Sequence, residues 1–296
     1  MPMHLLVLSI SCSVAVSVLL KLARSQSIGI AQAVTLNYAV AGLLCWLLLR
    51  PSWEQLPATA GGWAILAALG VLLPSIFLVM AAAVNQAGIV RSDAAQRLSL
   101  FLPLAAAFLI FGETLSSDKL AGLVTAIAAL LLLLMRNHGP ATAGSTTGGS
   151  RNAPVPAAWQ APVCLLGVWL GYGTIDILFK QLARSGTAFA SGLLVSFLMA
   201  GSLMIVTLVL RRIRWSRRDL IGGAILGLLN FGNIYFYIRA HQHFPENPTL
   251  VFTAMNIGVI SVGTLVGAGI FRERLSRWNI LGIALALAAI VLLIPR

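Results

Sequence analysis

The sequence predicts an all-α integral membrane protein with ten transmembrane helices, arranged as two inverted five-helix repeats. Three observations predict this class: the composition, the lengths of the apolar stretches and an internal duplication. Of 296 residues, 59% are hydrophobic and only 9% are charged, whereas a soluble domain has about 45–50% apolar and about 25% charged residues. This composition excludes a disordered chain, a disulfide-stapled secreted domain and a soluble enzyme.

The apolar residues fall into stretches of the length that a membrane helix needs, which is roughly 20 residues for about 30 Å of hydrocarbon. Strands of a membrane barrel would be shorter and would alternate strictly between polar and apolar residues. The charges, prolines and Gly/Ser clusters delimit ten predicted helices: 4–22, 30–49, 61–84, 88–111, 118–135, 159–182, 187–210, 219–241, 248–271 and 277–295.

A polar segment divides these helices into two groups of five. Residues 137–158 contain mainly Gly, Ser, Thr, Pro and Ala, which predicts a flexible linker between a repeat at 1–136 and a repeat at 159–296. The F-x-E-x-L-S sequence at 111–116 returns 160 residues later at 271–276. An L-A-R-S sequence returns at the same offset, which indicates an internal duplication.

The odd number of helices in each copy has a geometric consequence. A second copy that follows five spans enters the membrane from the opposite face, so the repeats are inverted about an axis in the membrane plane. This symmetry is typical of secondary transporters, whose substrate site lies near the midplane between the repeats and opens to either side in turn. One alternative is an intramembrane enzyme acting on lipid-linked groups, which the scattered acidic residues favour less. Another is a channel, which the inverted duplication favours less.

The five-plus-five arrangement resembles the drug/metabolite transporter superfamily, specifically its EamA-like branch. The resemblance covers nearly the whole chain and is clearest from Pro103 through Glu113 to Gly122, whereas Gly263 replaces the corresponding proline in the second half. It implies ten helices around a central cavity and a permease for efflux or exchange of small metabolites. The substrates of the family include amino acids, sugars, nucleotide sugars and drugs, so the resemblance does not name one.

The net charge of +12 bears on orientation in the cell (inner or plasma) membrane. Of the 20 Lys and Arg residues, 14 fall on the side of the membrane opposite the two termini and 6 on the side of the termini. The excess is concentrated in residues 211–218. The positive-inside rule therefore places both termini outside, whereas the family resemblance implies that both lie inside.

Charged residues within the predicted helices are candidate functional residues, because an ionisable group inside a bilayer costs several kcal/mol unless it is paired or hydrated. The fourth predicted helix contains Arg91, Asp93, Gln96 and Arg97. Arg97, together with Arg91, would bind an anionic substrate group, with Asp93 as a counter-ion that also carries a proton. Alternatively, Asp93 and Arg97 form a structural i,i+4 ion pair and Arg91 extends to the membrane surface.

The sixth predicted helix contains a second i,i+4 pair, Asp176 and Lys180. Asp176 would bind a substrate amine or a coupling proton, and the alternative is that Lys180 neutralises it in a pair that only fixes packing. Asn37, Trp169 and Tyr172 are secondary candidates for the polar and aromatic walls of a cavity. Trp and Tyr are also common at membrane interfaces.

The eighth predicted helix is unusually polar. Asn230 and Asn233 share one face, and Tyr237 follows one turn later. Such a strip would line a polar cavity or form interhelical hydrogen bonds. Asn256 occupies the repeat position of Gln96, so the two amides suit a site on the symmetry axis.

These residues together suggest a small polar or zwitterionic metabolite or amphiphile as substrate, with no catalytic residue and no nucleic-acid partner. The sequence predicts no cofactor: P-loop and hydrolase motifs are absent, and the three cysteines are far apart. His241 and His243 are a weak metal pattern, so no metal site is predicted. Glu113 and Glu273 are predicted to cap the helices that follow them. The oligomeric state is left as monomer or homodimer.

Overall fold

The computed structural model describes the helical part of the chain, and every regular element in the described residues is a helix. This confirms the predicted all-α class. The predicted linker at 137–158 lies outside the described residues, as do Pro103 and Glu113. The described residues are 3–99, 101–102, 105, 117–134, 159–184, 187–243, 248–273 and 275–292.

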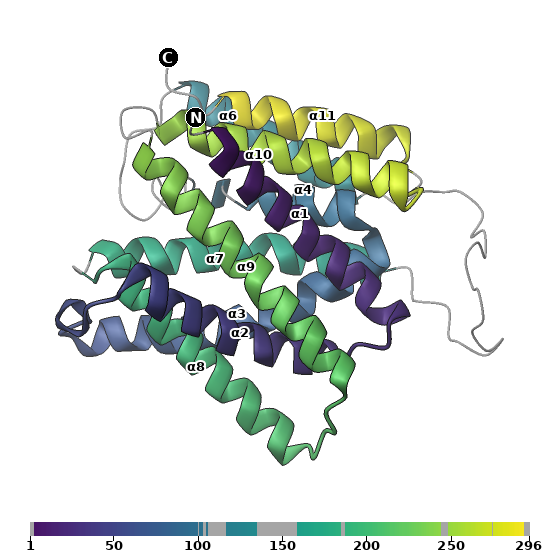
Figure 1. Cartoon of the computed structure of the whole chain (residues 1–296). Helices are drawn as coiled ribbons and strands as arrows, with labels where there is room; N and C mark the ends of the chain where they lie inside the picture. Colours follow the sequence, from purple (N-terminus) through teal and green to yellow (C-terminus); the bar gives the residue numbers. More distant parts are fainter. Residues whose placement is uncertain are drawn as a thin grey trace.

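The helices follow the predicted apolar stretches closely (Figure 1). A short 3-10 turn, η1, precedes α3, and a π-helical turn, η2, continues α10. The elements are α1 (Met3–Ser25), α2 (Ile30–Leu49), η1 (Trp53–Gln55), α3 (Ala60–Ala87), α4 (Ile89–Leu98), α6 (Ser117–Leu134), α7 (Gln160–Arg184), α8 (Phe189–Leu210), α9 (Arg217–His243), α10 (Pro248–Thr264), η2 (Leu265–Ile270) and α11 (Arg277–Leu292).

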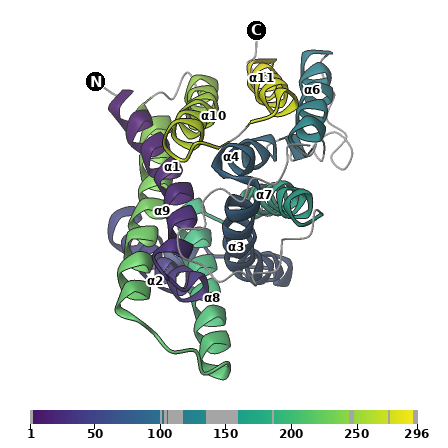
Figure 2. The same ribbon diagram turned by 90° about the vertical axis from the view of Figure 1, so that its right-hand side faces the viewer.

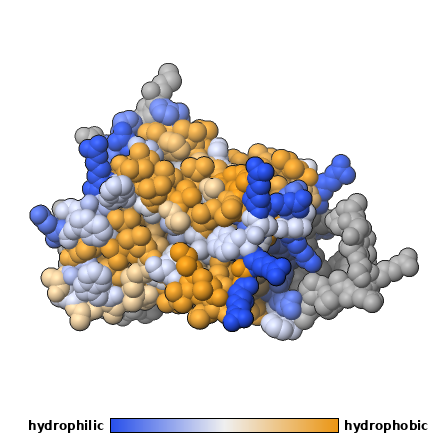
Figure 3. Space-filling view, turned by 60° about the horizontal axis from the view of Figure 1, so that its bottom comes forward, coloured by the Kyte–Doolittle hydropathy of each residue, from blue (hydrophilic) through white to orange (hydrophobic). Residues whose placement is uncertain are grey.

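Six helices of the described residues are long and apolar enough to cross a membrane: α1, α2, α3, α7, α8 and α9. Three shorter apolar segments lie in α6, α10–η2 and α11. Many large apolar side chains, such as Leu43 and Trp46, are exposed. Figure 3 shows hydrophobic residues over most of one face and hydrophilic residues gathered toward its ends. These features are those of an integral membrane protein.

The helices before and after the linker interleave. The most extensive packing joins α2 to α9, α3 to α8, α1 to α9, α3 to α7, and α6 to α11, so each of these contacts crosses from one half of the chain to the other. The smaller contacts of α1 with α10 and of α7 with α4 continue this pattern. In Figures 1 and 2, α6, α10 and α11 lie together at the top, and α2, α3 and α8 lie at the bottom.

The helices α4 and α10, which contact one another, are shorter than the predicted spans. The stretch 88–111 was expected to form one helix, but α4 ends at Leu98. The Ser99 hydroxyl donates to the Gln96 carbonyl at 2.6 Å, and the Trp169 indole N–H donates to the Leu98 carbonyl at 3.1 Å. These side chains satisfy carbonyls at the end of the α-helical ladder. On the other side, α10 passes into the π-helical turn η2 at Leu265.

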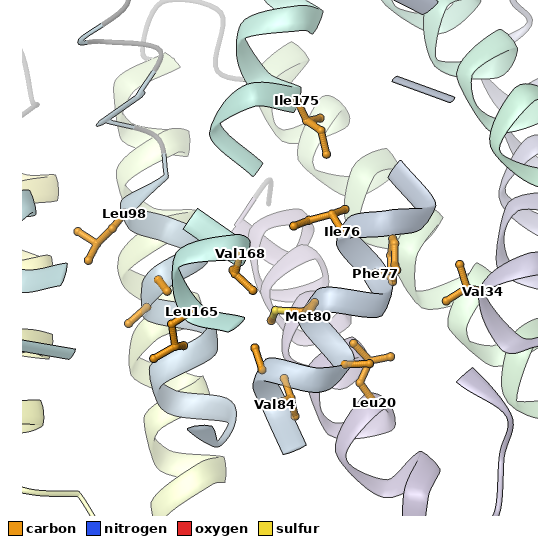
Figure 4. Packing of buried hydrophobic residues seen from close by; sticks show 14 of the residues in the cluster. Leu20, Val34, Ile76, Phe77, Met80, Val84, Leu98, Leu165, Val168 and Ile175 are labelled. Atoms are coloured by element: carbon orange, nitrogen blue, oxygen red, sulfur yellow. The ribbon is translucent and has the colours of Figure 1, made fainter. Parts of the chain in front are cut away.

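Close packing of α3 against α7 forms much of the apolar core (Figure 4). Ile76, Met80 and Val168 are among its buried members. A Cβ at Gly171 would lie 2.4 Å from Cδ1 of Ile76, so a larger residue there would displace the end of this side chain. Small residues at helix contacts are typical of membrane proteins, because association in lipid depends on close van der Waals contact rather than on the hydrophobic effect.

Candidate functional site

One face of α1 carries a polar stripe that organises the site. Ser9, Ser13, Ser17 and Lys21 follow one another at intervals of four residues, and therefore lie on one face of the helix. The three serines are buried. Each of the four side chains binds a polar group of another part of the chain, as described below. We call these four residues the α1 polar stripe.

Beside this stripe lies a cavity with two adjoining lobes. Seven residues belong to both linings: Gln96, Tyr172, Asp176, Phe189, Asn233, Ile234 and Tyr237. The first lobe, of about 250 Å³, holds the charged groups. Its walls come from α4, α7, α8, α9 and α10, so both halves of the chain contribute. The lining residues are Gln96, Arg97, Ser99, Tyr172, Asp176, Phe189, Asn233, Ile234, Tyr237, Ile238, Met255 and Asn256.

The second lobe, of about 390 Å³, is mostly apolar and aromatic. It extends toward α2, α3 and α8, and Tyr38 there makes ring contacts with Phe77 and Phe197. Polar groups enter its lining mainly from α1, α4, α7 and α9. The lining residues are Ser13, Val16, Ser17, Tyr38, Leu73, Ile76, Phe77, Met80, Gln96, Tyr172, Ile175, Asp176, Phe179, Phe189, Leu193, Phe197, Asn230, Asn233, Ile234 and Tyr237.

Arg97 is the cation of the first lobe. Its Nη2 donates to Oγ of Ser13 at 2.8 Å. Within the described residues, its buried Nε has no hydrogen-bond partner. Asp176 and the phenols of Tyr172 and Tyr237 lie within its electrostatic reach. A guanidinium has five N–H donors in a fixed plane, so Arg97 retains donors for a planar carboxylate in the cavity.

Asp176 is the anion of the same lobe and borders both lobes. Lys180, one turn further along α7, is exposed and does not line the cavity. The two residues of the predicted i,i+4 pair therefore have different environments. Asp176 and Arg97 place one negative and one positive charge in the same lobe.

Amide side chains of α9 form part of the wall. The Oδ1 of Asn233 accepts a hydrogen bond from Oγ of Ser9 at 2.9 Å, and Asn233 lines both lobes. Asn230 lines the second lobe and donates from Nδ2 to Oδ1 of Asn37 at 3.1 Å. Asn230 therefore fits both predictions made for the polar residues of α9, because it lines the cavity and also forms an interhelical hydrogen bond. Tyr237 lines both lobes and packs against the ring of His241.

Asp93 lies behind the cavity. It is 2% exposed and is absent from the lining of both lobes. Its Oδ1 accepts a hydrogen bond from Oγ of Ser17 at 2.6 Å. No hydrogen bond or ion pair joins Asp93 to Arg97 in the described structure; instead, each binds a different serine of the α1 polar stripe.

The fourth member of the stripe binds Glu273. The Nζ of Lys21 lies 2.6 Å from Oε1 of Glu273. The same carboxylate accepts the backbone N–H groups of Ile89 at 2.8 Å and Val90 at 3.2 Å, and so caps the start of α4. Arg91, in the first turn of α4, is buried within electrostatic reach of Glu273. We call Lys21, Glu273 and the first turn of α4 the α4 joint.

The prediction that Glu273 caps the helix that follows it is wrong, because Glu273 caps the start of α4 instead. The expected cap of the following helix, α11, is formed by Ser276 and Asn279: the Asn279 N–H donates to Oγ of Ser276 at 3.1 Å. Ser276 occupies the N-cap position of α11. Glu273 lies three residues before it in the sequence and therefore cannot be the N-cap residue. The chain turns after η2, so Glu273 faces the start of α4.

The structure brings together eight of the residues selected from the sequence. Asp93, Arg91, Lys180, Asn37 and Trp169 lie outside the cavity lining. No group of three or more His, Cys, Asp or Glu that could hold a metal ion occurs among the described residues. The eight lining residues are Gln96, Arg97, Tyr172, Asp176, Asn230, Asn233, Tyr237 and Asn256.

Sequence reasoning missed the serines of α1 and the phenylalanines of the cavity wall. The signal for the serines was present, because Ser9, Ser13 and Ser17 repeat every four residues in an apolar helix. No comparable signal distinguishes Phe77 or Phe197, which line the cavity, from other apolar residues of the spans.

This chain is similar in sequence to another protein over nearly its whole length. The chain is 51% identical over 293 residues to an uncharacterized protein of Haemophilus influenzae (strain ATCC 51907 / DSM 11121 / KW20 / Rd), covering 97% of this chain and 96% of that protein. The chain belongs to the same family as this protein. No protein-family model matches the sequence.

A solved structure, described only as the crystal structure of a protein, has a related fold. Its TM-score is 0.56 at 17% sequence identity, and the match covers 96% of this chain and 94% of the other. The similarity therefore extends over nearly the whole length of both chains. At this identity it concerns the fold alone.

Proposed function

We propose that this protein is a secondary active transporter, an exporter or exchanger, that moves a small amphipathic zwitterion by alternating access. The observation that carries the proposal is the convergence of polar residues from α4, α7, α9 and α10 on one cavity in an otherwise apolar protein. Buried polar groups in a membrane protein are costly and typically mark the path of a substrate.

The two lobes favour a substrate with two chemically different ends. In the first lobe, Arg97 would bind a carboxylate and Asp176 an ammonium group, so that the charges of both protein and substrate are neutralised. In the second lobe, the rings of Tyr38, Phe77 and Phe197 would contact an apolar side chain. The volumes of the lobes, about 250 and 390 Å³, suit a small metabolite.

The packing pattern supports the proposed inverted repeats of ten spans. Under the repeat, the contact of α1 with α9 corresponds to that of α7 with α3, and the contact of α2 with α9 corresponds to that of α8 with α3. The helices α4 and α10 occupy equivalent places, contact one another and both line the cavity. Because the halves interleave, alternating access would move groups of helices from both repeats rather than one half against the other.

We place the transporter in the cell (inner or plasma) membrane. The bias of Lys and Arg puts the termini outside, and the family resemblance puts them inside. A fusion at Arg296 to a reporter that is active only in the cytoplasm distinguishes these orientations, since its activity would place the termini inside.

Reconstituted protein tests the transport proposal directly. Purified protein is first screened for thermal stabilisation by a metabolite panel that includes L-alanine, L-leucine, L-phenylalanine and their amine-only and carboxylate-only analogues. Proteoliposomes loaded with an unlabelled hit then exchange it for the labelled compound. We expect saturable exchange, strongest for a zwitterion with a large apolar side chain. Flux that does not saturate would indicate a channel, and folded protein that exchanges no member of the panel would contradict the proposal.

A further inference from the structure

The buried carboxylate of Asp93 has no role in lining the cavity, and it needs an explanation. It lies in α4 between α1 and α10, with 2% of its surface exposed. One oxygen accepts the hydroxyl of Ser17, and the other, Oδ2, has no hydrogen-bond partner among the described residues. An ionised carboxylate in such a place is costly, because a buried charge needs several donors or a paired cation.

The described residues around Asp93 supply no hydrogen bond or ion pair that neutralises its carboxylate, so a bound proton is the remaining way to neutralise it. A Cβ at Gly263 of α10 would lie 2.8 Å from Oδ2 of Asp93, so the backbone of α10 lies close to this oxygen. The sequences of α10 and α3, both packed against α4, contain no charged residue. The groups that act electrostatically on Asp93 or are acted on by it are Arg97 on its own helix, Glu273 beyond η2 and Tyr172 on α7.

These neighbours do not replace the proton. Arg97 is directed to Ser13 and the first lobe, and Glu273 is held by Lys21 and the start of α4. Tyr172 lines the cavity. Arg277 of α11 is exposed, and the side chains of Asp118 and Lys119 in α6 lie outside the described structure.

We propose that Asp93 is a proton-binding site of the transporter, reached from the cavity through the hydroxyl of Ser17. Ser17 lines the second lobe, and its Oγ lies 2.6 Å from Oδ1 of Asp93. A proton from the cavity binds Oγ while the hydroxyl proton of Ser17 passes to Oδ1. The hydroxyl is thus regenerated, and the carboxylate becomes a neutral acid.

This step would couple the proton to the substrate, and here the inference rests on the proposed function. A proton on Asp93 removes the negative charge that acts on Arg97 from behind the cavity. The positive charge of Arg97 is then available to a substrate carboxylate. By thermodynamic reciprocity, substrate binding favours proton uptake by the same factor. The proton and the substrate therefore occupy the same state of the carrier, which fits the exchanger rather than a proton-driven exporter.

Infrared spectroscopy of the purified protein in bilayers tests the site without a substrate. We expect the wild type to show, over a pH titration, the C=O stretch of a protonated carboxylic acid that Asp93→Asn removes and Asp176→Asn retains. Ser17→Ala keeps the carboxyl group and removes its hydroxyl partner, so we expect the band to shift in frequency and to respond to a pH jump roughly tenfold or more slowly.

Three outcomes overturn the proposal. They are the absence of any protonated-carboxyl band in folded wild type at every pH, a band that Asp93→Asn leaves unchanged, and a band whose frequency and response Ser17→Ala leaves unchanged. If Asp93→Asn does not fold, Ser17→Ala still decides the question. Failure of transport with an intact Asp93 band would contradict the proposed function alone, because the spectrum does not depend on transport.

Discussion

The α1 polar stripe meets charged groups in two regions that are built differently. In the α4 joint, both oxygens of Glu273 accept donors: Oε1 from Lys21 and Ile89, and Oε2 from Val90. At the cavity, Arg97 makes one hydrogen bond to Ser13, and its Nε has no partner among the described residues. In the α4 joint, the protein itself supplies donors to both oxygens of Glu273. At the cavity, Arg97 retains N–H donors for a ligand.

The difference separates a structural role from a binding role. A carboxylate that caps a helix and pairs with a lysine stabilises one arrangement of three segments and has little capacity for a ligand. A guanidinium with spare donors in a cavity is suited to bind one. We therefore expect substitutions in the α4 joint to change stability more than transport, and substitutions at the cavity to do the reverse.

The largest expected effect is the loss of transport in Arg97→Ala. Removal of the cation that binds the substrate carboxylate should cost about 3 kcal/mol of binding, or roughly a hundredfold in transport at low substrate concentration. Insertion and thermal stability should stay close to wild type. The control is Arg239→Ala, since Arg239 is exposed and lines neither lobe. Wild-type exchange by Arg97→Ala in proteoliposomes would remove Arg97 from the site.

The complementary change is Glu273→Ala in the α4 joint. It removes the partner of Lys21 and the cap of α4, and we expect a loss of about 2–3 kcal/mol in the free energy of unfolding. Transport per folded molecule should remain within a few-fold of wild type. Glu54→Ala is the matched control, because Glu54 is an exposed glutamate in η1. Unchanged stability in a denaturant or thermal series would contradict the structural role of Glu273.

A third substitution tests the packing around Asp93. The Cβ added by Gly263→Ala would lie 2.8 Å from Oδ2 of Asp93, which forces α10 or the carboxylate to move. We expect a loss of about 1–2 kcal/mol in stability. Gly269→Ala is the control, because a Cβ there meets no atom within 4 Å. Equal melting temperatures for the two variants would show that the contact with Asp93 is not tight.

The smallest effect is expected for Asn230→Leu, at the boundary between the two roles. It breaks the hydrogen bond to Asn37, and such interhelical bonds contribute about 0.6 kcal/mol on average. We expect this small loss of stability together with a few-fold weaker apparent affinity, because Asn230 also lines the second lobe. Asn85→Leu serves as the control, since exposed Asn85 binds a carbonyl of its own helix. Identical substrate affinity in the two variants would assign Asn230 to packing alone.

Local patterns predicted the helices well. The predicted stretch 30–49 coincides with α2, and 187–210 differs from α8 by two residues at its start. The fourth stretch was predicted less well, because the end of α4 depends on Ser99 and on the indole of Trp169. Trp169 is distant in sequence, so no local pattern of apolar residues contains this information.

Composition and the length of the apolar runs were enough to predict an all-α membrane protein and the polar residues that its helices must accommodate. The partners of these polar residues, in contrast, depend on how the helices pack. The i,i+4 spacing of Asp93 and Arg97 allowed an ion pair, but packing of α1 beside α4 supplied Ser17 to one and Ser13 to the other. It also turned Glu273 toward α4. Interactions between distant segments depend on how the helices pack. This packing places Arg97 at the cavity, where it can bind a ligand, and Glu273 in the α4 joint, where it has a structural role.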